Sequence, residues 1–272
     1  MRPPARACAT AGPAPGRYAC AVLMLPWHLT DHLASGLNVT PPGDMVVIAG
    51  RPGTTGSPWA DLVGVYAGLR AAVAAATAPP VVLTGDCVAA LAVVAGVQRR
   101  GTRAGLVWFD AHADFHTEQT TTSGYLGGLP LAKAVGRGDL TLPKALGLTP
   151  LPEESAMLVD GRDLDPPEVT ALASSQVLRC SVTDLDTAVL PAGPLVVHVD
   201  LDVLDPAALA GLRFPAAGGP SLQDVADGIA AVARRREVAA LDIAATWHPA
   251  EARRDQTDAA LHAVLAAAGM SG

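Results

Sequence analysis

The sequence carries two short motifs, DAHADFHT and HVDLDVLDP, in which acidic residues and histidine recur at every second position. The side chains concerned are Asp110, His112, Asp114, Asp200 and Asp202. In an extended backbone, residues two apart point to the same side, so each motif would present its polar groups to one crevice. Four carboxylates in a buried pocket would repel one another and take up protons unless cations compensated them. The two motifs therefore predict a pair of bound divalent cations.

Carboxylates with some imidazole suit hard or borderline metal ions. We expect two Mn²⁺ per chain and leave Fe²⁺, Zn²⁺ and Ni²⁺ open as alternatives. Two such ions can share a bridging water and lower its pKa, which makes hydroxide available at neutral pH. A lone DxD is commonly only a turn or a helix cap. Two such motifs, DxHxD and DxDxxDP, each directly after an apolar strand, favour a metal site instead.

Short apolar runs alternate with longer alanine-rich runs, which predicts an α/β fold with a mostly parallel sheet. Polar clusters follow several strands directly, and ligand crevices in such sheets lie at the carboxyl ends of strands. We expect one catalytic domain over 1–272 with an irregular segment at 1–16. Strands are expected at 45–50, 81–85, 104–110, 156–161, 176–180, 194–200 and 238–244. Helices are expected at 59–77, 87–99, from Ser221 as N-cap onward, and from Thr257 to Ala268.

The composition of the 272 residues limits the functional class. Nineteen basic against 26 acidic residues give a net charge of −7, and no basic cluster is dense enough to follow a phosphate backbone. We therefore expect no nucleic-acid partner. Prolines and Asp86 interrupt the most apolar stretch, so we expect no membrane span. The four cysteines form no disulfide framework and no signal peptide is recognisable, which favours a cytoplasmic setting.

Four motifs over residues 45–265 resemble those of the ureohydrolase superfamily, which includes arginase, agmatinase and formimidoylglutamase. They are GDC (85–87), DAHADFHTEQTTTSGYLGG (110–128), GRDLDPPE (161–168) and HVDLDVLDP (198–206). The resemblance implies a three-layer α/β/α fold with a parallel sheet of about eight strands and a dinuclear Mn²⁺ site. It also implies homo-oligomers in many members, although no residue here decides the oligomeric state.

The resemblance assigns a role to each metal-site residue. Asp110 and Asp200 would bridge the two ions, and His112 and Asp202 would hold one of them. Asp114 would hold the other and accept a hydrogen bond from the bridging hydroxide, which makes it the expected catalytic residue. Most members have GDH where this chain has GDC, so Cys87 stands in the place of a histidine ligand. We expect the Cys87 thiolate to bind metal, with a small buried apolar residue as the alternative.

The resemblance also assigns substrate-binding residues. Thr121, Ser123, Asp165 and Glu168 match the positions that grip the α-amino and α-carboxylate groups of the substrate in arginases. His116 replaces the asparagine usual in this loop, and it would either donate a hydrogen bond to a carboxylate or only cover the site. These residues together favour a small amino-acid substrate.

Two departures from the family pattern bear on the substrate. Gly127 takes the place of a histidine thought to shuttle protons, and Ala245 takes the place of a glutamate that pairs with the guanidinium. A hydroxyguanidine needs these groups less than a guanidinium does, because its electron-withdrawing oxygen lowers its basicity and leaves a neutral form near pH 7. We therefore expect hydrolysis of Nω-hydroxy-L-arginine to L-ornithine and hydroxyurea by the metal-bridging hydroxide, with Asp114 passing the proton to the leaving nitrogen.

Within the family, this substrate and the cysteine in the GDH position resemble the Nω-hydroxy-L-arginine amidinohydrolase type of D-cycloserine biosynthesis, an antibiotic pathway. Three alternatives stay open. The chain could be another ureohydrolase acting on arginine, guanidino acids or formimidoylglutamate. It could be an inactive, metal-binding regulatory homologue, or a metal-dependent deacetylase, which the lack of a His-His pair disfavours.

The remaining histidines carry weaker signals. We expect His28 and His32 at the surface or at the entrance to the site, and His262 in the last helix, either packed or at the surface. His198 lies two residues before Asp200, so it would either support the metal ligands or be a satisfied buried histidine. His248 could line the pocket in place of the missing glutamate.

Overall fold

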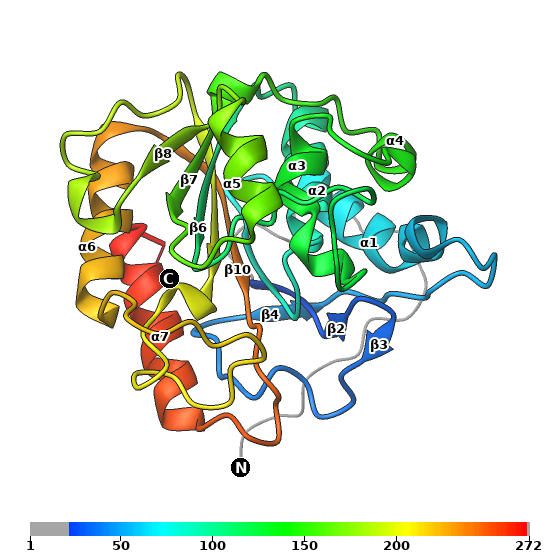
Figure 1. The fold of residues 1–272 in the computed structure, drawn as a ribbon. Helices are drawn as coiled ribbons and strands as arrows, with labels where there is room; N and C mark the ends of the chain where they lie inside the picture. Colours follow the sequence, from blue (N-terminus) through cyan, green and yellow to red (C-terminus); the bar gives the residue numbers. More distant parts are fainter. Residues whose placement is uncertain (1–21, 271–272) are drawn as a thin grey trace, which may run out of the picture.

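The computed structural model describes residues 22–270, in which eight parallel strands form one twisted sheet (Figure 1). The strand order is β4-β1-β5-β10-β9-β6-β7-β8. The strands are β1 (Val22–Leu25), β4 (Met45–Val47), β5 (Val81–Thr84), β6 (Gly105–Asp110), β7 (Ala156–Asp160), β8 (Leu178–Cys180), β9 (Leu195–Asp200) and β10 (Val238–Ala244). The central strands β5, β10, β9 and β6 are buried along their whole length, as expected of a parallel sheet covered on both faces.

Helices cover both faces of the sheet and complete three layers (Figure 1). One face packs against α1 (Pro58–Ala75), α2 (Ala89–Arg99), α3 (Pro130–Ala134), α4 (Thr141–Leu146) and α5 (Pro166–Ala173). The other face packs against α6 (Leu222–Arg235) and α7 (Arg254–Ala267). Each face has its own apolar core, with alanine-rich α2 almost wholly buried. Small side chains on α2 let this helix lie close to the strands that carry the polar motifs.

Short elements occupy the connections. A two-stranded hairpin pairs β2 (Trp27–His28) with β3 (Asp31–His32). Four 3-10 turns follow the chain at η1 (Leu126–Gly128), η2 (Glu153–Ser155), η3 (Val182–Asp184) and η4 (Leu201–Val203). The η4 turn begins directly after β9, so the second polar motif leaves the sheet as a tight turn.

The predicted α/β fold with its parallel sheet is confirmed, including all seven predicted strands. The eighth strand, β1, is not predicted from the sequence. Its apolar run is only four residues long, and a Pro/Ala-rich segment rather than a helical run precedes it. The strand predicted at 45–50 ends already at Val47. Ser221 caps α6 as predicted, with its hydroxyl accepting from Asp224 N. The irregular segment predicted at 1–16 lies outside the described residues.

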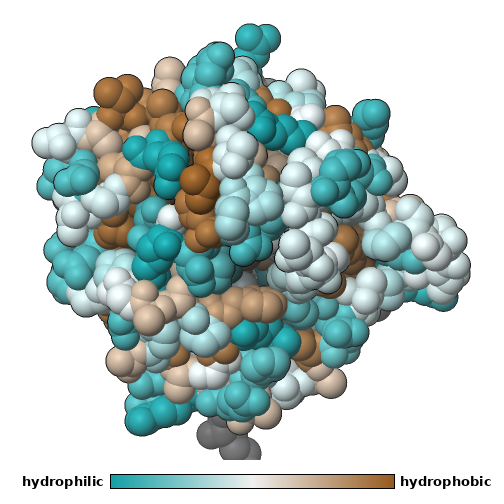
Figure 2. All heavy atoms as spheres, in the orientation of Figure 1, coloured by the Kyte–Doolittle hydropathy of each residue, from teal (hydrophilic) through white to brown (hydrophobic). Residues whose placement is uncertain are grey.

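The surface carries hydrophobic residues in separate areas. On the face seen in Figure 2 they lie as brown areas among white and teal ones. The large apolar side chains exposed among the described residues are Val47, Val169, Val189 and Phe214. Between residues 22 and 270, no helix combines the length and the hydrophobicity that crossing a bilayer requires.

Candidate active site

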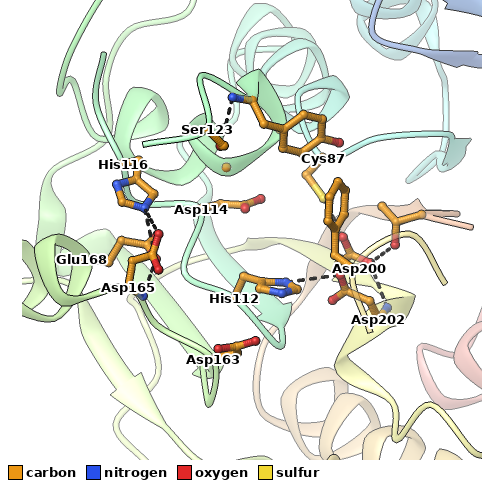
Figure 3. Close-up of a pocket in the computed structure, with 15 residues that line it drawn as sticks. Cys87, His112, Asp114, His116, Ser123, Asp163, Asp165, Glu168, Asp200 and Asp202 are labelled. Atoms are coloured by element: carbon orange, nitrogen blue, oxygen red, sulfur yellow. Dashed lines mark hydrogen bonds and ion pairs between the residues drawn. The ribbon is translucent and has the colours of Figure 1, made fainter. Parts of the chain in front are cut away.

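A cavity of about 310 Å³ opens at the carboxyl ends of the central strands. Its size is at the lower end of the range for small-molecule sites. Its lining combines acidic, imidazole, thiol and aromatic side chains from segments far apart in the sequence (Figure 3). The lining residues are Cys87, His112, Asp114, His116, Ser123, Tyr125, Gly127, Gly128, Asp163, Asp165, Glu168, Asp200, Asp202, Phe214 and Thr246.

The two polar motifs converge as predicted, but the backbone that achieves this is not extended. Asp110 ends β6, and its Oδ1 accepts a hydrogen bond from His112 N at 2.7 Å. Asp200 ends β9, and its Oδ1 accepts from Asp202 N at 2.8 Å. Each of these two carboxylates therefore stabilises a turn by accepting a hydrogen bond from the backbone N–H two residues later. This turn, rather than strand alternation, brings the paired side chains to the same crevice.

Asp114 completes the first motif in a strained conformation. Its φ of 49° lies in the left-handed region, which few residues other than glycine adopt. The first turn of α3 supports it, because Ala132 N donates to Asp114 O at 3.2 Å. Its side chain is buried, and its Oδ2 has no hydrogen-bond partner among the described residues. A buried carboxylate oxygen aimed at a cavity without a partner indicates a site for a cation.

The electrostatics of the cluster are unfavourable without added positive charge. Burial and then the charge of Asp110 raise the pKa of Asp200 to about 6. Burial, followed by neighbouring carboxylates, also raises the pKa of Asp114 and of Asp202 well above the usual value. Burial lowers the pKa of His112, but hydrogen bonds and charges from Asp110 and Asp202 outweigh it and raise that pKa to about 12. Burial and mutual repulsion thus disfavour the charged forms of Asp114, Asp200 and Asp202, and added positive charge would relieve this.

Cys87 lies inside this cluster, directly after β5. Its Sγ is 2.8 Å from Asp200 Oδ2, and its side chain is buried. Burial and then the charge of Asp200 raise the pKa of the thiol well above its usual value. The thiol is thus held protonated by its surroundings, and only a cation beside it would favour the thiolate.

The donor set fits two divalent cations. His112 Nδ1 is 3.3 Å from Asp110 Oδ1 and 3.2 Å from Asp202 Oδ2, so three donors face one point. Cys87 Sγ lies 2.8 Å from Asp200 Oδ2, and the buried Asp114 Oδ2, without a partner among the described residues, faces the same cavity. Divalent cations would neutralise the carboxylates and replace the protons that the cluster now binds.

A second group of polar residues lies at the other end of the cavity (Figure 3). His116 Nε2 is 3.1 Å from Asp165 Oδ2 and 3.6 Å from Glu168 Oε2. Ser123 also lines the cavity, whereas Thr121 lies outside the lining and its hydroxyl accepts from Gly124 N. Four of the five predicted substrate-binding residues therefore line the cavity. Asp114 lies between them and the metal-type cluster, which consists of Cys87, Asp110, His112, Asp200 and Asp202.

Arg162 holds the loop behind this group. Its guanidinium pairs with Asp160 and donates to the carbonyl oxygens of Val203 and Ala216. These bonds tie the GRDLDPPE loop to the segment that follows Asp202 and carries Phe214 to the cavity mouth.

Sequence reasoning missed Tyr125, which lines the cavity beside Gly127. A Cβ on Gly127 would lie 2.3–2.5 Å from two ring atoms and the hydroxyl oxygen of Tyr125, so the tyrosine side chain occupies the space of any side chain there. Tyr125 Oη is 3.3 Å from His28 Nε2, and the ring packs 4.8 Å from that of Phe214. The GYLGG stretch carries the only sequence hint, since a glycine beside a tyrosine leaves room for the ring.

The site also corrects several predictions for single residues. Of the two positions expected for His28, the surface one is wrong, because its side chain is buried with Nδ1 2.9 Å from Gly85 O and Nε2 against the cavity-lining Tyr125. Ala245 is buried, and the neighbouring Thr246 lines the cavity and donates to Asp200. His248 is not among the lining residues. His32 is exposed, one of the two positions expected for it, and His262 takes the surface position of the two alternatives left open.

Comparison with known proteins places this arrangement in a family context. The model of the Arginase family matches residues 4–270. An arginase of Eremothecium gossypii is 32% identical over 180 residues, which is 60% of this chain and 45% of that protein. An N(omega)-hydroxy-L-arginine amidinohydrolase of Streptomyces lavendulae is 35% identical over 133 residues, or 47% of each chain.

The chain thus spans about half the length of the curated relatives it matches. The fold is similar over a longer stretch. The solved structure of Bacillus caldovelox arginase superposes with a TM-score of 0.73 at 20% identity, covering 92% of this chain and 96% of that one.

Proposed function

This chain belongs to the arginase family, and on that basis we propose that it is a dinuclear-metal hydrolase of Nω-hydroxy-L-arginine. The products would be L-ornithine and hydroxyurea. Asp110 and Asp200 would bridge two divalent cations, with Mn²⁺ as the first candidate. His112 and Asp202 would hold one ion, and Cys87 and Asp114 the other.

The cations would make water nucleophilic at neutral pH and stabilise negative charge at the reacting carbon. Asp114 is suited to proton transfer, because its Oδ2 is buried, faces the cavity and is free of other partners among the described residues. It would take the proton of the attacking water and hand it to the leaving nitrogen. The left-handed backbone at Asp114 fixes the direction of this carboxylate.

The observation that carries the choice of substrate is the packing around Gly127 and Ala245. The Tyr125 ring fills the space beside Gly127, and buried Ala245 offers no charge to the cavity. A guanidinium would find neither a carboxylate nor a histidine at these two positions. A hydroxyguanidine is less basic and can bind as the neutral form, so it loses less from their absence. Its N–OH group can also exchange hydrogen bonds with polar atoms of the wall.

The far end of the cavity suits the amino-acid part of this substrate. Asp165 offers an acceptor to an α-ammonium group, and Ser123 offers a donor to an α-carboxylate, while His116 orients Asp165 through Nε2. In Figure 3, Asp114 and an open part of the cavity lie between the two polar groups. An extended amino acid with its reacting group at one end and its charged groups at the other fits this shape.

The proposal is tested by comparing kcat/KM for Nω-hydroxy-L-arginine, L-arginine, agmatine and formimidoylglutamate on the Mn²⁺-loaded chain. Ornithine and either hydroxyurea or urea are quantified as products. We expect the hydroxyguanidine to be preferred by at least about 100-fold, which corresponds to about 2.7 kcal/mol of transition-state binding. Preference for L-arginine would end the substrate proposal while keeping the hydrolase. Full metal loading with no turnover on any of the four compounds would favour an inactive, regulatory homologue.

A further inference from the structure

A fully buried histidine lies beneath the metal-type cluster. His198 is on β9, two residues before Asp200, and its side chain has no exposed surface. Its Nδ1 is 2.8 Å from Asp242 Oδ2 on the neighbouring strand β10, at the same register position. On the other side its ring stacks on Trp108 of β6, with 3.7 Å between ring centroids. The ring is therefore held in one orientation by both neighbouring strands.

The second ring nitrogen of His198 lacks a partner in the part of the chain that the structure describes. Its Nε2 is buried and has no hydrogen-bond partner among the described residues. A carboxylate can only accept, so the bond to Asp242 places the proton on Nδ1 and leaves a lone pair on Nε2. A buried polar atom without a partner destabilises the folded state. Such an atom next to a cluster of carboxylates indicates that its partner is a cation.

The position of His198 relative to its neighbours agrees with this interpretation. One donor atom each of Cys87, Asp110 and His198 lie within 4.8 Å of one another, and all three residues are buried. Ligands at about 2.0–2.3 Å from a metal ion lie no more than about 4.6 Å apart, so these donors can share one ion with little movement. Sulfur, oxygen and imidazole nitrogen together suit a transition metal.

We propose that His198 supplies a nitrogen ligand to the cation that Cys87 would also bind, so that a thiolate, carboxylates and an imidazole hold this ion. The proposal rests on the dinuclear site proposed above. In relatives with a GDH motif the imidazole would come from the position of Cys87. Here the imidazole would come from β9, two residues before the proposed bridging ligand Asp200. Asp242 acts as the positioning carboxylate that orients the ring, as in carboxylate–histidine–metal arrangements.

The test uses the whole chain loaded with two equivalents of Co²⁺. Paramagnetic proton NMR shows a strongly shifted, exchangeable N–H signal for each cobalt-bound imidazole that keeps a proton on its other nitrogen. We expect two such signals, one from His112 and one from His198. The His198 signal should exchange slowly, because its N–H is buried against Asp242. A single signal from the wild-type chain would overturn the proposal whether or not any variant folds.

Variants assign the signals and measure the contribution of His198. His198→Gln should remove one signal. It should also raise one of the two Co²⁺ dissociation constants by more than the roughly 10–100-fold typical of losing a residue that only hydrogen-bonds to a metal ligand. His112→Gln should remove the other signal, and exposed His262→Gln should leave both in place. Unchanged cobalt affinity and both signals in folded His198→Gln, checked by circular dichroism, would show that His198 is no ligand.

This readout is separate from turnover. Two imidazole signals in a chain that hydrolyses none of the tested compounds would leave the ligand assignment standing and the proposed function refuted. Turnover of Nω-hydroxy-L-arginine with only the His112 signal would do the reverse.

Discussion

At the scale of single residues, Asp200 is the point on which the metal site depends. Its carboxylate accepts hydrogen bonds from Asp202 N, Cys87 Sγ and Thr246 Oγ1. It therefore connects residues from three strand ends. Removing it leaves the thiol and the hydroxyl without an acceptor and takes away one of the two proposed bridging ligands.

Asp200→Ala is expected to lose both metal and activity. We expect fewer than two Mn²⁺ per chain by elemental analysis and at least a 1000-fold lower kcat/KM, or about 4 kcal/mol of transition-state stabilisation. Asp227→Ala on the exposed side of α6 is the matched control and should keep both. Two bound ions and full turnover in Asp200→Ala would show that the ligand assignment is wrong.

The packing of Tyr125 against Gly127 explains why this chain has no side chain at position 127. Gly127→Ala would push its new methyl group into the Tyr125 ring, and overpacking of this kind costs about 1–3 kcal/mol. We expect a loss of that size in urea unfolding. Tyr125→Ala should remove the clash, so the double variant should be more stable than the sum of the two single effects predicts. Strict additivity in this cycle would contradict the packing account.

At the scale of elements, α5 connects the polar group around Asp165 to the backbone that follows Asp114. Glu168 lies in its first turn, where Oε2 accepts from Asp165 N at 3.2 Å and Oε1 accepts from Phe115 N at 3.0 Å. One buried carboxylate thus fixes the start of α5 and the backbone directly after Asp114. Glu168 positions its neighbours through these backbone bonds in addition to lining the cavity.

Glu168→Ala is expected to cost about 2 kcal/mol in urea unfolding, because two backbone N–H groups lose their acceptor. It should also raise KM by at least tenfold, since His116 and Asp165 lose a shared neighbour. Ser221→Ala is the matched control at the start of α6, far from the site, where it should cost about 1 kcal/mol and leave KM unchanged. An equal KM for both variants would mean that the α5 cap is only structural.

At the scale of the whole molecule, the buried charges couple folding to metal binding and to pH. In the metal-free chain, burial and the charge of Asp110 raise the pKa of Asp200 from 3.8 to about 6. Its folded state keeps a proton that the unfolded state releases, so the stability present below about pH 4 is lost as the pH rises through 6. His112 acts in the same direction, because its pKa is raised from 6.5 to about 12.

The metal-free chain should therefore be more stable near pH 5 than near pH 7.5. Asp200 alone contributes about 1.4 kcal/mol to this difference, because its pKa of about 6 lies one unit above the lower pH. Urea unfolding with a chelator present measures it, and Asp200→Asn should flatten the dependence between pH 4 and 6. Saturating Mn²⁺ should reverse the order, because cations bind the deprotonated carboxylates and stabilise the folded state by mass action. Metal-free protein that gains stability from pH 5 to 7.5 would contradict this account.

Local pattern in the sequence determined the layered α/β architecture and the convergence of the two acidic motifs. This succeeds because strands buried on both faces are continuously apolar, and because a polar cluster at a strand end inherits its place from the strand. The family resemblance of the GDC motif, together with its place after an apolar strand, predicted that Cys87 lies with Asp110 and Asp200. The short strand β1 was not predicted because four apolar residues at the end of a Pro/Ala-rich stretch of sequence carry too little periodicity.

Tertiary structure alone decided the features that depend on contacts between distant segments. Tyr125 fills the space at Gly127 and reaches His28, 97 residues away, which no local pattern encodes. The turns closed by Asp110 and Asp200 replace the extended geometry that alternation suggested. The free Nε2 of His198 follows from packing between β10 and β6, because only the folded sheet decides which buried polar atoms find a partner.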